Sequence, residues 1–295
     1  MDTRKIIQDS AAYIDAHLKD PLSVEILAAK AGFSPYYYCR VFSLYMGMPA
    51  MEYVRRRRLT HGASEICAGR RIIDVAMDYG FESHNGFSKA FRKVYGYSPD
   101  EYRRRVSSHR PIAPNPLAGQ SDLPIHPKVR VEKRNGFYIA GMVIRTASDL
   151  TSIAQQPAVW QKIWLSEKEN KIYAAARPKE HGEYYISFPV KTGLYRLVTC
   201  VKVDDPEEVD AGLYVDWVPP GMYGVFTSPP TDKDFAQRVM DTWRYIFEVW
   251  LPDSPYAWNP VGLDYEFYDE RCHGAPYSMD ICIPLLPKGE TSCPN

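Results

Sequence analysis

Two segments of the sequence carry polar side chains at spacings of three and four residues, which places the side chains of each segment on one face of an α-helix. The first segment presents Tyr36, Cys39, Arg40 and Ser43, and the second presents Asn85, Ser88, Lys89 and Arg92. Arg and Lys side chains hydrogen-bond O6 and N7 of guanine, and Asn side chains hydrogen-bond N6 and N7 of adenine. These residue types predict two helices that read bases in the major groove of double-stranded DNA.

The two segments are copies of each other at a constant offset. The offset relates Ser34 to Ser83, Arg40 to Lys89, Phe42 to Phe91 and Gly47 to Gly96. Each copy follows a short helix of small residues that ends in glycine, at Gly32 or Gly80. The order of helix, glycine turn and helix predicts a duplicated helix-turn-helix, whose two recognition helices enter successive major grooves.

Capping residues mark the ends of the expected helices. Ser23 is expected to cap a helix over residues 24–31, and Ser34 followed by Pro35 begins the first recognition helix. A helix over residues 49–68 is expected to pack on both motifs and hold them apart. Its four arginines, Arg55–Arg58, surround the helix, so we expect some to contact phosphates and the others to be solvated.

Four stretches in this part resemble the signature of AraC/XylS-type transcription regulators. They are residues 74–76, 79–83, 87–93 and 96–102, the last of which reads Gly-Tyr-Ser-Pro-Asp-Glu-Tyr. The resemblance spans residues 1–107. It implies that Tyr36, Arg40, Asn85 and Lys89 occupy base-reading positions. It also implies activation of transcription through contact with RNA polymerase, with repression as an open alternative.

Length and charge agree with a DNA-binding part joined to a second domain. A chain of 295 residues most naturally forms two domains with separate cores. The net charge is zero, but residues 1–110 carry 18 Lys and Arg against 12 Asp and Glu, so the rest of the chain is acidic. A basic first part fits contact with phosphates.

The composition indicates no metal, cofactor or membrane. The six cysteines form no Cys-x-x-Cys pair and have no histidine at zinc-ligand spacing, so neither a metal site nor a disulfide framework is expected. No apolar run approaches the length of a membrane span, and the first ten residues include four charged side chains, so neither a membrane span nor a signal peptide is expected. We therefore expect a cytoplasmic protein that needs no cofactor.

A proline-rich stretch separates the two parts of the chain. Residues 108–127 contain five prolines and a glycine, which excludes a helix or a central strand and predicts a semi-extended linker. The expected multidomain architecture is an all-α DNA-binding domain over residues 1–107 and a second domain over residues 128–287. A short tail follows over residues 288–295.

Beyond the linker, some segments repeat their hydrophobic residues with the period of a strand and others with the period of a helix. Strands are expected over residues 129–144, 172–176, 184–190, 195–203, 263–268 and 279–284, and helices over residues 157–168 and 234–250. The order β-α-β-β occurs twice. It predicts an α+β domain with helices on one side of an antiparallel sheet.

Three segments of the second domain resemble GyrI-like effector-binding domains. They are residues 221–226, 266–269 and 279–285. The resemblance implies that residues 128–287 bind a small molecule in a groove between the two repeats. Relatives usually carry Glu at the position of Asp280, a carboxylate that pairs with cationic ligands. Asp keeps the charge but is one methylene shorter, which leaves the ligand and any hydrolase activity of the family open.

Aromatic side chains are frequent in the second domain, and some are expected to line the ligand site. Burial and cation–π attraction contribute about 0.5–2 kcal/mol for each ring that contacts a ligand. The candidate ligand-binding residues are Trp160, Tyr185, Tyr223, Glu266 and Asp280. The expected ligand is an aromatic or cationic small molecule.

These features predict a sequence-specific, DNA-binding transcription regulator whose second domain senses a small-molecule effector. One alternative is a hydrolase fused to a DNA-binding domain, in which Asp280 or Glu266 acts as general base beside a tyrosine. The scattered histidines, with no Ser-His-Asp or phosphate-loop motif in the sequence, favour the regulator. A second alternative, a protein-interaction module docked on DNA, predicts no ligand pocket.

Overall fold

The computed structural model describes residues 3–106, 125–147, 168–191, 194–259 and 261–289. The chain divides near residue 118 into two compact units. Within the described ranges, no helix combines the length and the apolar character needed to cross a bilayer. The boundaries predicted for the two domains, the linker and the tail stay a prediction, because residues 107–124 and 290–295 lie outside the described residues.

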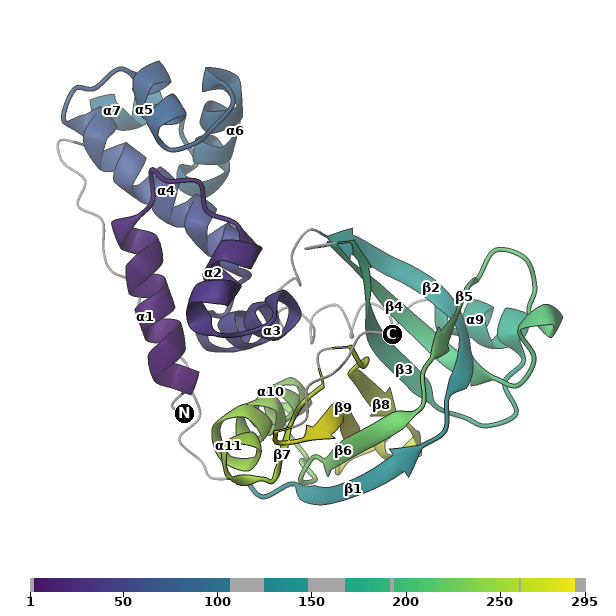
Figure 1. Cartoon of the computed structure of the whole chain (residues 1–295). Helices are drawn as coiled ribbons and strands as arrows, with labels where there is room; N and C mark the ends of the chain where they lie inside the picture. Colours follow the sequence, from purple (N-terminus) through teal and green to yellow (C-terminus); the bar gives the residue numbers. More distant parts are fainter. Residues whose placement is uncertain (1–2, 107–124, 148–167, 192–193, 260, 290–295) are drawn as a thin grey trace. The chain divides into compact units, whose positions relative to one another are not determined.

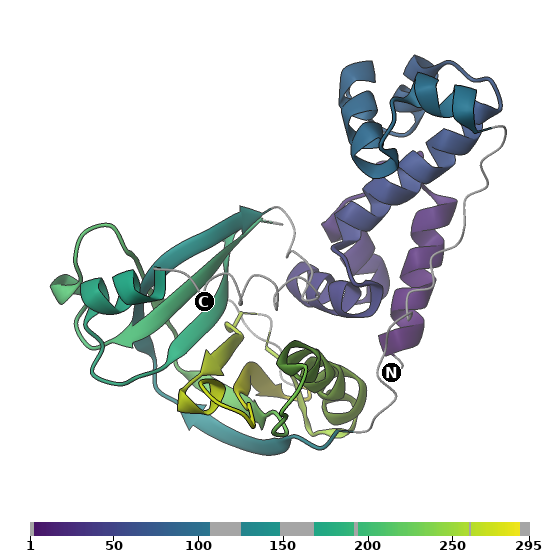
Figure 2. The same ribbon diagram turned by 180° about the vertical axis from the view of Figure 1, so that it is seen from behind.

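The first unit is helical, with two similar pairs of helices on either side of a longer one (Figure 1). Its helices are α1 (Thr3–Ala16), α2 (Val24–Ala31), α3 (Pro35–Met46), α4 (Ala50–Cys67), α5 (Ile72–Asp78), α6 (His84–Tyr95) and α7 (Pro99–Arg105). The pairs α2–α3 and α5–α6 are the two helix-turn-helix motifs. Figure 2 shows from the other side that α4 runs between them. The predicted duplication is confirmed.

Polar caps begin both recognition helices where the sequence predicts them. The hydroxyls of Ser34 and Ser83 each accept a hydrogen bond from the backbone amide three residues further on, at 3.3 and 3.1 Å. Such a cap accepts a hydrogen bond from one of the backbone amides that have no acceptor within the first helical turn, and it stabilises the helix by about 1 kcal/mol. Gly47 and Gly96 end these helices with φ of 66° and 76°, a left-handed conformation that favours glycine.

Two of the four consecutive arginines in α4 hold the helical unit together. Arg57 is only 7% exposed and makes a bidentate ion pair with Asp15 of α1, with N–O distances of 2.7 and 2.8 Å. Arg58 donates hydrogen bonds to the backbone carbonyls of Leu18 and Asp20, just beyond the end of α1. The expected roles of phosphate contact or solvation do not hold for these two arginines, because α1 and the residues after it engage them.

Close contacts fix both recognition helices to α4. At Gly62 of α4 a Cβ atom would lie 3.1 Å from the Val75 side chain and 3.4 Å from the ring of Phe87, so glycine allows α5 and α6 to approach. The rings of Phe42 and Tyr53, 5.6 Å apart, join α3 to α4. The 18 residues of α4 span about 27 Å. This length is of the order of the roughly 34 Å between successive major-groove sites on one side of a duplex.

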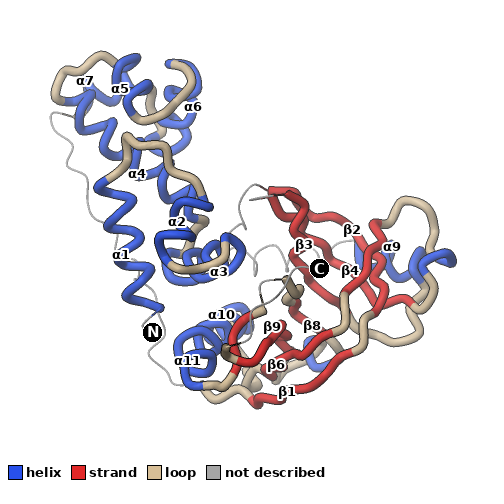
Figure 3. Tube along the Cα trace, in the orientation of Figure 1, coloured by secondary structure: helices blue, strands red, loops and turns tan. Residues whose placement is uncertain are grey.

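The second unit contains one antiparallel sheet, drawn in red in Figure 3. Its strands are β1 (Lys128–Arg134), β2 (Phe137–Ala147), β3 (Glu183–Lys191), β4 (Leu194–Val203), β5 (Tyr214–Val218), β6 (Gly221–Thr227), β7 (Tyr256–Trp258), β8 (Tyr265–Tyr268) and β9 (Asp280–Pro287). The order in the sheet is β1-β6-β9-β8-β3-β4-β2-β5, and β7 pairs with β9. The helices are α9 (Lys168–Ala176), α10 (Phe235–Tyr245) and α11 (Leu251–Asp253). The predicted α+β class is confirmed.

Residues 172–176, where the sequence predicts a strand, belong to the helix α9 instead. The segment Lys168–Ala176 reads KENKIYAAA and is rich in good helix formers. Ile172 and Ala176, one helical turn apart, are both buried against Val201 and Val203 of β4. A short apolar run is compatible with the periods of both a strand and a helix, and the burial of residues four apart shows that this one is a helix. The helix expected over residues 157–168 lies outside the described residues, except for Lys168.

The single strand expected over residues 129–144 is two strands, β1 and β2, interrupted at Asn135 and Gly136. β1 pairs with β6, whereas β2 pairs with β4 and β5, so the two strands lie in different parts of the sheet. A Cβ atom on Gly136 would lie 2.1 Å from the Trp217 ring, which shows how closely the backbone approaches β5 there. The described residues form nine strands where the sequence predicts six, because β1 and β2 replace one predicted strand, residues 172–176 form a helix, and the prediction lacks β5, β6 and β7.

The sheet has a helix face and a second face, because successive strand residues point to opposite sides. On the helix face, Val201 packs against α9 and Glu266 contacts α10. On the second face, Ile186, Val225 and Tyr265 belong to a buried apolar cluster. Both helices cover the same side of the sheet, as the sequence predicts.

Candidate DNA-reading surface and ligand site

The recognition helix α6 presents its predicted DNA-reading side chains to solvent. Asn85, Lys89 and Arg92 are exposed and Ser88 is half-buried. Their spacings of three, one and three residues place them on one side of the helix, and the opposite side carries the fully buried Phe87 and Phe91. The buried aromatic side fixes α6 in the helical unit and leaves its polar side accessible.

The recognition helix α3 differs from the prediction for its polar face. Cys39, Arg40 and Ser43, expected to face outward, are buried, and Arg40 is only 3% exposed. Tyr36 is half-buried, with the Arg40 guanidinium 5.9 Å from its ring centre. All residues from Tyr38 to Met46 are buried, so α3 is covered around its circumference. Hydrophobic spacing reveals only the side of a helix that faces its own core, so it does not predict the burial of these polar side chains.

The five predicted ligand-binding residues do not share one side of the sheet. Tyr185 lies opposite Glu266, and Glu266 lies opposite Ile281, which places Tyr185 and Glu266 on the helix face. Asp280, next to Ile281, therefore points to the second face, where Tyr223 also lies. The expectation of a single pocket is wrong for these four residues, because alternation along each strand does not determine the register between strands. Trp160 lies outside the described residues.

Glu266 is a buried carboxylate whose two oxygens are both engaged. It is 1% exposed and accepts hydrogen bonds from Trp243 Nε1 and from the Tyr268 hydroxyl, both at 2.7 Å. Burial, followed by the charge of Glu266, raises the pKa of the Tyr268 phenol, which therefore stays a donor. This arrangement ties α10 to β8 and gives Glu266 a structural role.

Trp243→Phe is expected to destabilise the second unit by about 1–3 kcal/mol, because it removes one of the two donors to the buried carboxylate. The measurement is urea unfolding followed by tryptophan fluorescence, since all six tryptophans lie beyond residue 128. Trp217→Phe, at an exposed position, is the matched control and should change stability by less than about 0.5 kcal/mol. Equal losses in the two variants would contradict the role of Glu266.

Five aromatic rings on the second face form what we call the aromatic cluster: Phe137, Tyr184, Tyr223, Tyr265 and Phe267. Neighbouring ring centres lie 4.8–5.9 Å apart, within the range of favourable aromatic pairs. Tyr223 and Tyr265 are buried, whereas the other three rings are half-buried and present part of their surface. The cluster is part of the apolar core of the second face, and its three half-buried rings lie at the edge of that core.

Charged groups surround the aromatic cluster in compensated pairs. Asp280 accepts a hydrogen bond from Thr227 at 2.6 Å and pairs with Arg130 at 3.5 Å and Arg271 at 3.2 Å. Hydrogen bonding to Asp269, and also to Asp280, raises the pKa of the Arg271 guanidinium. The carboxylate that the family resemblance assigns to cationic ligands already has two arginine partners here.

A further ion pair and several protonated groups also lie near the cluster. Arg134 pairs with Glu132 at 2.8 Å and donates to the Tyr265 hydroxyl at 2.9 Å. Burial raises the pKa of Tyr223 to about 12 and that of the Cys282 thiol to about 12. Both groups are protonated at neutral pH, so neither supplies a nucleophilic anion.

The sequence identifies Tyr223 and Asp280 on this face but misses Phe137, Tyr184 and Phe267. The sequence does not show which tyrosine of β3 lies on the second face, because Tyr184 and Tyr185 are adjacent and point to opposite faces. The sequence shows that Tyr265 and Phe267 point to one face of β8 and Glu266 to the other. Only the strand pairing shows that Tyr265 and Phe267 share the face of Tyr223.

Two protein families match the two units. Residues 27–105 match a helix-turn-helix domain, and residues 130–285 match the integron-associated effector binding proteins. Regulatory protein SoxS of Escherichia coli K12 is 39% identical over 107 residues, 36% of this chain and 100% of that protein. The right origin-binding protein of the same strain is 36% identical over 134 residues, 45% of this chain and 46% of that protein. A solved integron cassette protein of Vibrio cholerae is 17% identical with a TM-score of 0.36, covering 54% of this chain and 95% of the other.

Proposed function

Because the chain belongs to the AraC-type transcription regulators, and its residues 130–285 to the integron-associated effector binding proteins, we propose how its two activities divide between its residues. The protein is a DNA-binding transcription regulator modulated by a small-molecule effector. In this proposal the exposed face of α6 reads bases and the aromatic cluster holds the effector. The observation that carries the first part is the set of exposed side chains Asn85, Lys89 and Arg92 on one helix face.

The effector is, in this proposal, a neutral or anionic aromatic molecule that stacks on Phe137, Tyr184 and Phe267. Their half-buried rings supply apolar contact. A cationic ligand would have to displace Arg130 or Arg271 from Asp280, and each displacement costs an ion pair. The compensated charges therefore favour ligands that do not require a free carboxylate.

The ligand controls DNA binding only if it has different affinities for two states of the protein. Arg40 and Ser43 on α3 are buried, and both side chains must become accessible before they can contact bases. The proposal keeps Tyr36, Cys39, Arg40 and Ser43 as DNA-binding residues, with roles that require their side chains to be exposed. Activation through RNA polymerase, and a cytoplasmic place of action, belong to the same proposal.

The hydrolase alternative requires a carboxylate that can take a proton from water. Glu266 is 1% exposed and engaged by Trp243 and Tyr268. Asp280 is buried and engaged by Thr227 and two arginines. Neither carboxylate is placed as a general base, so we propose that the second unit binds its ligand without converting it.

The ligand class is tested by thermal shift of the full chain with naphthol, naphthalene carboxylate and tetraphenylphosphonium as probes. Ligand at a hundred times its Kd stabilises the protein by about 2.7 kcal/mol, so a binder is readily detected. We expect naphthol or the carboxylate to raise Tm and tetraphenylphosphonium to have no effect. A shift with the cation alone would contradict the assignment of the ligand class.

Tyr184→Ala is expected to weaken binding of the stabilising probe by about 0.5–1.5 kcal/mol, because one stacking ring is lost. The measurement is the ligand concentration that gives a half-maximal Tm shift. Tyr138→Ala removes an exposed ring of β2 that lies outside the aromatic cluster and should leave this concentration unchanged. If both variants bind the probe as the unchanged protein does, the aromatic cluster is not the site.

A further inference from the structure

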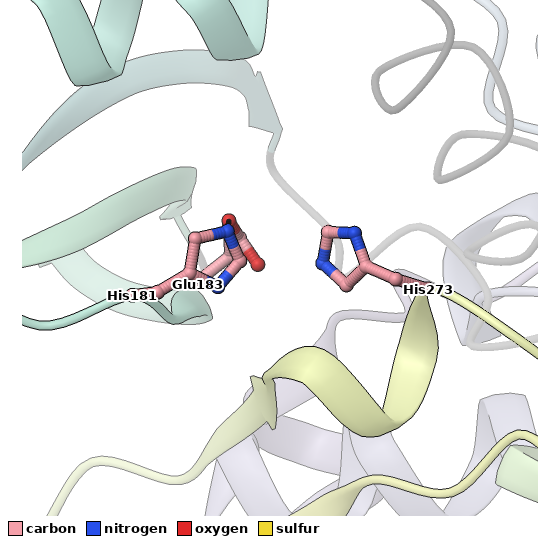
Figure 4. A group of neighbouring side chains, drawn as sticks. All are labelled: His181, Glu183 and His273. Atoms are coloured by element: carbon pink, nitrogen blue, oxygen red, sulfur yellow. Dashed lines mark ion pairs between the residues drawn. The ribbon is translucent and has the colours of Figure 1, made fainter.

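Two histidines and a glutamate from distant parts of the second unit converge at one end of the sheet (Figure 4). His181 lies two residues before Glu183, which is the first residue of β3. His273 follows the short 3-10 helix Glu270–Cys272, which comes after β8. The pairing of Glu183 with Tyr268 aligns the start of β3 with the end of β8 and so brings the three side chains together.

The three side chains are arranged like the ligands of a metal ion. One ligand atom from each residue lies within 4.8 Å of the others. His181 Nε2 is 3.7 Å from Glu183 Oε1, and the two imidazole ring centres are 5.0 Å apart. In Figure 4 the ring of His273 points across toward Glu183 and His181. A small contraction would bring nitrogen and oxygen atoms to about 2.0–2.2 Å from a common centre, the distances of zinc ligands.

Glu183 supplies a second, independent indication of a cation. Its side chain is only 7% exposed, and one oxygen, Oε1, accepts a hydrogen bond from the Tyr173 hydroxyl. The other oxygen, Oε2, is buried and has no hydrogen-bond partner. A buried carboxylate oxygen without a donor is costly, and a bound cation would remove that cost.

We propose that His181, Glu183 and His273 form a zinc site. Two imidazole nitrogens and one carboxylate are a ligand set that Zn²⁺ accepts, with the fourth position left for water or another ligand. The His181 side chain is 40% exposed, which gives the ion a path from solvent. The Tyr173 hydroxyl, which also accepts a hydrogen bond from the Gly182 amide at 3.2 Å, holds the carboxylate in place from outside the ligand set.

The zinc site gives the second unit an input separate from the aromatic ligand. Zinc would join the start of β3 to the segment that follows β8. That segment contains Arg271, whose partner Asp280 lies on the same face as the aromatic cluster. Metal occupancy would thereby restrain one of the arginines that compensate Asp280. The inference goes beyond the proposed function, because a protein without any organic effector would still bind the ion.

The site is tested by isothermal titration of the metal-free full chain with zinc chloride, and by visible absorption with Co²⁺ as a spectroscopic substitute. We expect one ion per chain and a cobalt spectrum of nitrogen and oxygen ligation. A cobalt–thiolate band would place the ion on cysteines and contradict the proposal. Failure to bind one ion per chain would contradict it as well.

Variants separate this site from adventitious binding. His273→Ala, at an exposed position, and Glu183→Gln should each weaken zinc binding by more than about 100-fold. Tyr173→Phe removes only the hydroxyl and should weaken it by about 10–100-fold. His126→Ala removes an exposed histidine outside the cluster and is the matched control. Unchanged affinity in His273→Ala would overturn the assignment, whatever the effect of Glu183→Gln.

Discussion

Asp15→Ala is expected to destabilise the helical unit by about 3–5 kcal/mol, because it leaves the guanidinium of Arg57 buried without its carboxylate. Arg57 belongs to α4, the helix to which both recognition helices are attached, and Asp15 belongs to α1. Loss of the pair therefore loosens the frame that sets the spacing of the two motifs. The measurement is urea unfolding followed by the helical circular-dichroism signal.

Asp9→Ala is the matched control for this variant. Asp9 also lies on α1 and pairs with Lys5 at 2.9 Å, but both side chains are more than 60% exposed. Exposed pairs contribute about 0–1 kcal/mol, since water competes for both charges. If Asp9→Ala and Asp15→Ala destabilise the protein equally, the buried ion pair does not hold α1 on α4.

The double variant Asn85→Ala/Lys89→Ala is expected to lose about 2–6 kcal/mol of specific DNA binding, because each base-reading side chain contributes about 1–3 kcal/mol. Both side chains are exposed on one face of α6 and make no contribution to its buried face, so the variant should fold normally. Fluorescence anisotropy with a labelled operator duplex, at one fixed salt concentration, measures the loss.

Lys5→Ala controls for the loss of one positive charge in the double variant. Lys5 is exposed on α1, away from both recognition helices in the sequence. It should weaken binding to the operator and to a scrambled duplex alike, and only slightly. The double variant should instead weaken binding mainly to the operator. An equal loss on both duplexes would mean that α6 contacts phosphates and does not read bases.

The helical unit could be predicted from the sequence because local chemistry determines it. Ser34 and Ser83 cap helices whether or not distant residues are in place, and Gly47 and Gly96 end them by a conformation of their own backbone. The repeated spacing of Phe42 and Phe91 shows the core side of each recognition helix. The burial of Arg40 could not be predicted in this way, because a polar residue on the outer side of a helix is expected to be exposed.

The ligand site could be predicted only in part, because it depends on strand register. Alternation shows that Tyr223 and Asp280 are candidates, but not that Glu266 and Tyr185 point to the other side. The proposed zinc ligands could not be predicted from the sequence either, because their proximity also depends on strand pairing. His181 and Glu183 are close in the sequence, whereas His273 joins them only through the pairing of β3 with β8.

The central claim is that this protein binds particular DNA sequences, and its most direct test uses the unmutated full chain. A duplex enriched by the protein from a random library is compared with a scrambled duplex of the same composition, by anisotropy at one salt concentration. Specific sites of this kind are bound about 10³-fold or more tightly than unrelated DNA, and we predict a ratio in that range. Equal affinity for the two duplexes would contradict the claim.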